Sequence, residues 1–131
     1  MIRLRALILA VVFTACQSVA VVPHHSMVAD RLFFGRNIPA GGTVTDIEWE
    51  RFLRSVITPR FPKGLTIWQA NGQWLDPRGE IVREPVFVVE IFHEVNDEDN
   101  VSIAAIAAEY EKRFGQDAVL RITTLSETHF Y

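Results

Sequence analysis

Segments with strand and helix patterns follow one another along this chain in the order strand, helix, strand, strand, helix, strand. The strand patterns lie at residues 30–38, 64–75, 81–92 and 118–123. This is the order of the ferredoxin-like split βαβ motif. Right-handed connections would place both helices on one face of the sheet. The sequence therefore predicts an α+β fold, ferredoxin-like β-α-β-β-α-β, with a four-stranded antiparallel sheet and two helices on one face.

The first helix has a clear start and end. Thr45 and Glu48 have the spacing of a capping box, in which each side chain bonds to the backbone of the other. Pro59 ends the helix, because a residue before proline is biased toward an extended conformation. Between them, apolar residues recur at helical spacing, at Trp49, Phe52, Leu53 and Val56.

The second helix follows the acidic loop 96–100, whose carboxylates suit a helix N-terminus, and Gly115 suits its C-terminal end. It has an apolar stripe at Ile103, Ile106, Ala107, Tyr110 and Phe114. In the hairpin between the helices, the spacing of Pro77 and Gly79 predicts a type I turn at 76–79. We expect a bulge at Gly72 and an edge position at Pro85.

The N-terminus has the layout of a bacterial export signal. Arg3 and Arg5 precede an apolar run at residues 6–13, which ends in small residues and Cys16. The run is too short to span a membrane, which takes about 20 residues. We predict that residues 1–15 are a lipoprotein-type signal peptide and that lipidated Cys16 is the first mature residue.

The position of cleavage stays open, because Ala20 offers an alternative site for an ordinary signal peptidase. Residues 16–28 are interpreted as a tether and residues 29–131 as the folded domain. Gln17 is not an aspartate, so in a Gram-negative host we expect a periplasmic protein held at the outer membrane through its lipid.

Five segments resemble those of a family of short exported bacterial proteins of unknown function. They are LFFGRN at 32–37, WERFL at 49–53, TPRFPKGLT at 58–66, GQW at 72–74 and IVRE at 81–84. The resemblance spans about residues 28–124. It implies lipidation at Cys16, since many members are lipoproteins, but it implies no activity.

Three arginines of these segments, Arg36, Arg60 and Arg83, are candidates for an anion site. Guanidinium groups gathered at one sheet end could clamp a carboxylate or a phosphate. Alternatively, each arginine pairs with a nearby acidic residue or packs on an aromatic ring.

A second candidate surface is the sheet face away from the helices. Alternation in the third strand places Val88, Glu90 and Phe92 on this face, and Phe87, Val89 and Ile91 toward the helices. In the last strand we expect Leu120 and Ile122 to point inward, and Val119, Arg121 and Thr123 to point outward. Trp68 is a further candidate for the outer face.

An apolar face of this kind is expected to be buried by a partner, a ligand or another segment of the chain. We expect a second copy of the chain, with a ligand or the C-terminal residues 126–131 as alternatives, and a semi-buried pair of Glu90 and Arg121. These expectations favour an interaction or binding module over an enzyme. The alternative function is a small-molecule enzyme, similar to ferredoxin-like oxygenases or isomerases, that acts in the cleft of a dimer. Glu90 or His93 would be its base.

The sequence gives little support to other classes of function. It holds 16 acidic and 13 basic side chains, without the basic surface that nucleic acids require. No spacing of histidine, cysteine and carboxylate residues is typical of a metal site, and no cofactor motif is present. Cys16 is the only cysteine, so no intrachain disulfide can form.

Overall fold

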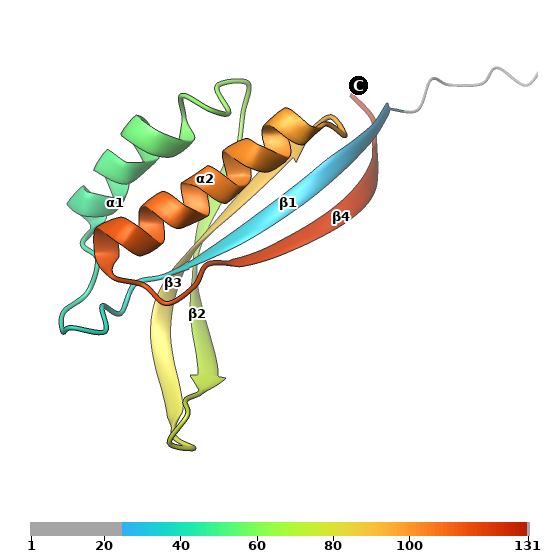
Figure 1. The fold of residues 1–131 in the computed structure, drawn as a ribbon. Helices are drawn as coiled ribbons and strands as arrows, with labels where there is room; N and C mark the ends of the chain where they lie inside the picture. Colours follow the sequence, from blue (N-terminus) through green and yellow to red (C-terminus); the bar gives the residue numbers. More distant parts are fainter. Residues whose placement is uncertain (1–24, 131) are drawn as a thin grey trace, which may run out of the picture.

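The computed structural model describes residues 25–130, which form one antiparallel sheet and the helices on it. The elements in chain order are β1 (His25–Gly35), α1 (Asp46–Phe52), the π-helix η1 (Leu53–Ile57), β2 (Thr66–Leu75), β3 (Ile81–His93), α2 (Asp97–Phe114) and β4 (Leu120–Thr128). The strands lie side by side in the order β2-β3-β1-β4. Figure 1 shows the helices on one side of the sheet. The ferredoxin-like α+β prediction is confirmed.

The first strand begins earlier than expected. β1 starts at His25, so residues 25–28 of the expected tether belong to the sheet, and residues 16–24 lie outside the described part. β1 is a central strand that pairs with β4 from His25 to Phe33 and with β3 from Val28 to Gly35. Backbone hydrogen bonds to its neighbours, rather than apolar alternation, extend the strand toward the N-terminus.

The first helix has the predicted capping box. The Glu48 N–H donates to Thr45 Oγ1 at 3.2 Å, and the Thr45 N–H donates to Glu48 Oε2 at 2.8 Å. Its second half, however, is a π-helix, in which the Thr58 N–H reaches the carbonyl of Leu53. Val56 and Ile57 are adjacent in sequence, and both are buried in this wider turn.

Aromatic rings fill the space between the helices and the sheet. Trp49, Phe52 and Phe114 are buried as predicted. The Trp49 ring stacks on Phe87, with centroids 4.3 Å apart and planes inclined by 7°. Tyr110 is fully buried and its hydroxyl donates to the carbonyl of Gly35 at 2.8 Å. Burial raises the pKa of Tyr110, so the hydroxyl stays protonated.

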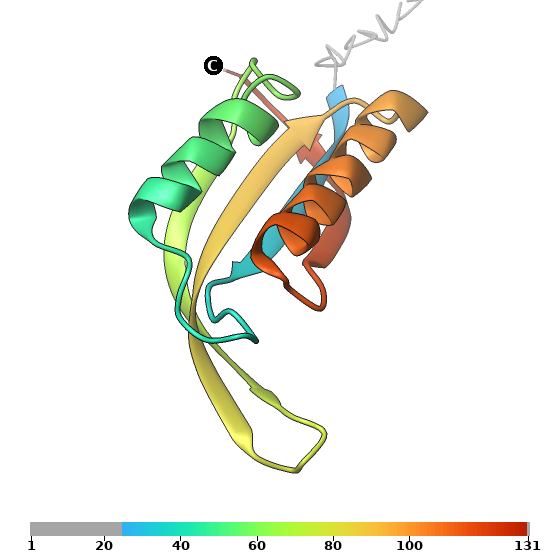
Figure 2. The same cartoon turned by 60° about the vertical axis from the view of Figure 1, so that its left-hand side comes forward.

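The β2–β3 hairpin extends beyond the helices as an arm (Figure 2). At its tip Asp76 accepts hydrogen bonds from the N–H groups of Arg78 and Glu80. The expected bulge at Gly72 is wrong, because pairing with β3 runs without a break from Thr66 to Leu75. Gly72 instead gives room to Val86, whose methyl group would lie 3.1 Å from an added Cβ.

Pro85 occupies a position where β3 has lost its neighbour on one side. β1 pairs with β3 only as far as Val86. The Pro85 carbonyl accepts from the N–H of Arg36, just past the end of β1. A proline without a donor is tolerated at such a local edge.

Candidate functional site

The sheet face away from the helices has an exposed apolar surface, which we call the open face. Cross-strand partners share a face, so the pairing of Trp68 and Phe33 with Val88 places all three there. Val88 is fully buried, whereas larger neighbours remain exposed. The exposed apolar side chains of the open face are Trp68, Phe92, Leu120, Ile122 and, on the β2–β3 arm, Trp74.

One ion pair lies within the open face. Arg31 donates to Glu90 Oε1 through Nε at 3.2 Å and through Nη2 at 2.5 Å. The Arg31 guanidinium carbon lies 5.7 Å from the centroid of the Trp68 ring. The side chain of Glu90 is 18% exposed to solvent and that of Arg31 is 44% exposed. The predicted pair of Glu90 and Arg121 is wrong, because Glu90 pairs with Arg31 in the structure.

A pocket of about 280 Å³ lies beside this ion pair. Its lining comes from β1, β3 and β4 and includes Arg31, Glu90, Phe92, Ile122 and Thr124. The open face therefore combines apolar surface, one carboxylate and one guanidinium around a small hollow.

The last strand has the opposite orientation to the predicted one. Leu120 pairs with Phe33 and Ile122 with Arg31, so both side chains lie on the open face. Arg121 pairs with Leu32 and faces the helices. Alternation permits both orientations of an edge strand. The observed orientation of β4 places Arg121 beside Asp30, a buried carboxylate that needs a cationic partner on the helix side.

Asp30 is the centre of a buried polar cluster on the helix side of the sheet. Arg121 donates to both of its carboxylate oxygens at 2.7 Å, and Thr123 Oγ1 donates to Oδ1. His93 Nε2 lies 2.8 Å from Asp30 Oδ2. Burial alone would raise the pKa of Asp30, but its hydrogen bonds from Arg121, Thr123 and His93 outweigh this and lower the pKa to about 2.

This cluster ties the start of α2 to the sheet. The second ring nitrogen of His93, Nδ1, lies 2.7 Å from the carbonyl of Glu94. Arg121 Nη1 donates to Asn100 Oδ1, in the first turn of α2, at 2.6 Å. Because both ring nitrogens are engaged within the fold, His93 has a structural role. Sequence reasoning overlooked Asp30, although its alternation with Leu32 and Phe34 already placed it on the inner face.

The three arginines considered for an anion clamp have separate surroundings. Arg36 bonds to Asp46 at 2.9 Å and lies over the Phe87 ring at 4.6 Å. Arg60 donates to the carbonyl of Val56 at 2.7 Å, and Arg83 belongs to the arm. Arg36 thus follows the alternative interpretation, in which each arginine serves a local partner.

Residues 25–130 contain no group of three or more histidine, cysteine, aspartate or glutamate side chains placed to hold a metal ion. No helix within this range is long and apolar enough to cross a membrane. Cys16 lies outside these residues.

Comparisons with known proteins identify relatives of the domain. The model of a family described as "Protein of unknown function (DUF3574)" matches residues 29–130. The solved structure of a phage SAM lyase in complex with S-methyl-5'-thioadenosine is similar at a TM-score of 0.59 and 17% identity, over 87% of this chain and 99% of that one. The structure of a phage SAM lyase in the apo state is similar at a TM-score of 0.57 and 16% identity, over 81% of this chain and 93% of that one. No curated protein matches the sequence. At these identities the likeness shows the fold alone.

Proposed function

The chain belongs to the DUF3574 family of proteins of unknown function, and we propose that it is an exported, lipid-anchored interaction module whose open face binds a second copy of the chain. The observation that carries this proposal is the exposed apolar surface around the Arg31–Glu90 pair. Export and anchoring at Cys16 rest on the N-terminal sequence.

The exposed apolar side chains supply the driving force for association. Phe92 is 45% exposed and Leu120 is 58% exposed. Full burial of such a side chain is worth about 1.5–3 kcal/mol. Residues 126–130 do not cover this face as a lid, since residues 126–128 continue β4 and Phe130 is 86% exposed. The apolar surface is therefore available to a partner.

The charges of the open face favour a second copy over other partners. Arg31 and Glu90 lie side by side, so a twofold axis through the pair would bring each arginine against the glutamate of the other copy. A twofold interface needs such a self-complementary patch. It also keeps both charges paired as water leaves, which avoids the large cost of an isolated buried charge.

Sedimentation of the purified chain tests this proposal. The wild type should sediment as a dimer, and Phe92→Asp should sediment as a monomer with an unchanged circular dichroism spectrum. The matched control is Val101→Asp, because Val101 is 67% exposed on α2, away from the open face. A wild-type monomer at high concentration, or a dimer in the Phe92→Asp variant, contradicts the proposal.

The pocket on the open face supports a second candidate, a small-molecule enzyme that works between two copies. Glu90 lines this pocket, whereas His93 and Arg121 belong to the helix side and do not. Glu90 is therefore the candidate base. Because the similar solved structures are those of a SAM lyase, SAM is the first compound to test. Turnover of SAM by the wild type that disappears in Glu90→Gln, with an unchanged circular dichroism spectrum, would favour the enzyme.

A further inference from the structure

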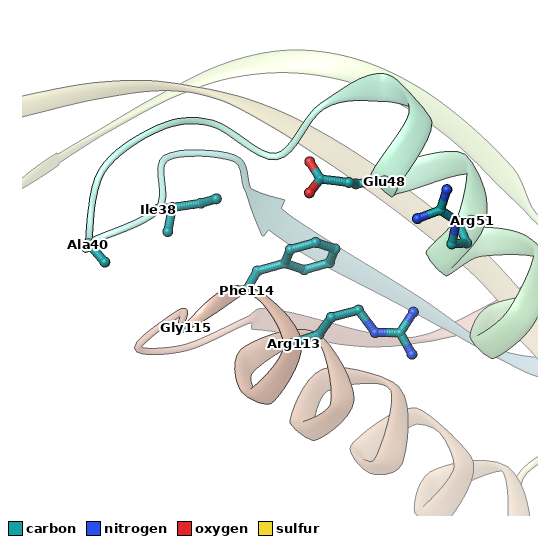
Figure 3. A pocket seen from close by; sticks show the side chains of 7 residues that line it. All are labelled: Ile38, Ala40, Glu48, Arg51, Arg113, Phe114 and Gly115. Atoms are coloured by element: carbon teal, nitrogen blue, oxygen red, sulfur yellow. The ribbon is translucent and has the colours of Figure 1, made fainter.

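A separate pocket of about 470 Å³ lies between the ends of the two helices, away from the open face (Figure 3). Its lining includes Ile38, Ala40, Glu48, Arg51, Arg113 and Phe114. We propose that this pocket binds an organic monocarboxylate with an apolar body, whose carboxylate lies between Arg51 and Arg113.

Arg51 has an electrostatic interaction with Glu48, but its N–H groups are left without an acceptor in the described part of the fold. It extends from the last turn of α1, and within residues 25–130 no side chain or carbonyl accepts a hydrogen bond from it. Figure 3 places Arg51 and Arg113 on the same side of the pocket, from different helices. A carboxylate between them could accept hydrogen bonds from both guanidinium groups.

Arg113 is held in position for such a contact. Its Nη2 donates to Glu109 Oε1 at 2.7 Å, and its guanidinium carbon lies 5.3 Å from the centroid of the Phe52 ring. A guanidinium has five N–H donors, so one bond to Glu109 leaves others for a ligand. This arrangement lowers the entropy cost of binding, because the side chain is already ordered.

The rest of the pocket offers an apolar wall. Figure 3 shows the Phe114 ring in the middle, with Ile38 and Ala40 on one side and the two arginines on the other. A ligand with its carboxylate at the arginines would therefore lay its hydrocarbon part along Phe114 toward Ile38. This geometry matches an aliphatic or aromatic acid and leaves a small inorganic ion without contacts on that side.

The charges also favour a single negative charge on the ligand. Glu48 lines the pocket. Its hydrogen bonds from the backbone and side chain of Thr45, together with the charge of Arg51, lower the pKa of Glu48, so it stays ionised. The C-terminal end of α2, at Phe114, adds partial negative charge. Both features oppose a dianion such as phosphate more strongly than a monocarboxylate.

Titration calorimetry of the full-length chain with octanoate and phenylacetate tests this inference. We expect saturable binding of at least one acid, and at least about tenfold weaker binding of the matching amide and of inorganic phosphate. Arg51→Gln and Arg113→Gln should each weaken binding by about tenfold. The control is Arg54→Gln, because Arg54 lies in η1 outside the lining.

Several results would overturn the inference. They are no saturable binding of either acid, equal binding of acid and amide, phosphate binding as tight as that of the acids, and unchanged affinity in Arg51→Gln. Thermal melting of each variant separates a lost contact from a lost fold. Arg51→Lys provides a second measure, since it keeps the charge and should retain more affinity than Arg51→Gln. Equal loss in these two variants would also count against the site.

Discussion

Asp30 shows how one buried charge organises its surroundings. Its carboxylate is fully buried, yet it receives hydrogen bonds from Arg121, Thr123 and His93. A buried ion is tolerated only when such partners replace its hydration. The partners come from β3 and β4, the two neighbours of β1 in the sheet, and Arg121 also reaches α2 through Asn100. The cluster therefore fixes the position of the helix on the sheet as well as the orientation of β4.

Asp30 should make stability depend on pH in a defined range. Its folded pKa of about 2 is below the ordinary value of 3.8, so the charged carboxylate stabilises the fold above about pH 4. This contribution, about 2 kcal/mol, is lost as the pH falls through 4 toward 2. Asp30→Asn should lower the free energy of unfolding at pH 7 by about 3 kcal/mol.

Urea unfolding between pH 7 and pH 2 measures this effect. The difference between the wild type and Asp30→Asn should shrink as the pH falls from about 4 to about 2. A difference that stays constant over this range would show that the Asp30 carboxylate does not contribute through its charge.

At the scale of elements, the first helix depends on its aromatic side chains. α1 has only the seven residues Asp46–Phe52, a length that is marginal in isolation. Trp49 and Phe52 anchor it to the sheet and to α2 through contacts with Phe34, Phe87 and Tyr110. Packing of these rings, added to the capping box, keeps the helix folded.

Phe52→Ala should therefore cost about 3–5 kcal/mol of unfolding free energy, because it leaves a cavity among close-packed rings. The control is Ile47→Ala, at a position of the same helix that is 72% exposed, and it should cost less than about 0.5 kcal/mol. Chemical denaturation monitored by tryptophan fluorescence measures both. A cost below about 1 kcal/mol for Phe52→Ala would mean that the helix does not depend on this contact.

At the scale of the whole molecule, the start of the sheet would limit the distance between the domain and a membrane if the proposed lipid anchor is present. β1 begins at His25. If Cys16 carries a lipid, residues 16–24 connect the lipid to the sheet. A fully extended segment of this length spans at most about 30 Å. The proposed anchor would therefore hold the domain close to the membrane surface.

Labelling with palmitate in the native host tests this anchor. Incorporation should occur in the wild type and disappear in Cys16→Ser, because only the cysteine thiol accepts the lipid. Mass spectrometry of the mature N-terminus provides the second measurement. An unlabelled protein that begins at Val21 would show ordinary cleavage after Ala20 and would remove the lipid from the proposal.

Local patterns in the sequence determined the element order, the start of the first helix at Thr45 and the inward side of β3. Each of these follows from spacing within a few residues. In the apolar run of β3, the single charged residue, Glu90, indicates the face that lies away from the core. Only the tertiary structure decided the orientation of β4 and the partner of Glu90. An edge strand that alternates Leu120, Arg121 and Ile122 satisfies either orientation locally. The decision came from Asp30, a buried carboxylate ninety-one positions away from Arg121 in the sequence, whose desolvation cost is met only when Arg121 faces inward.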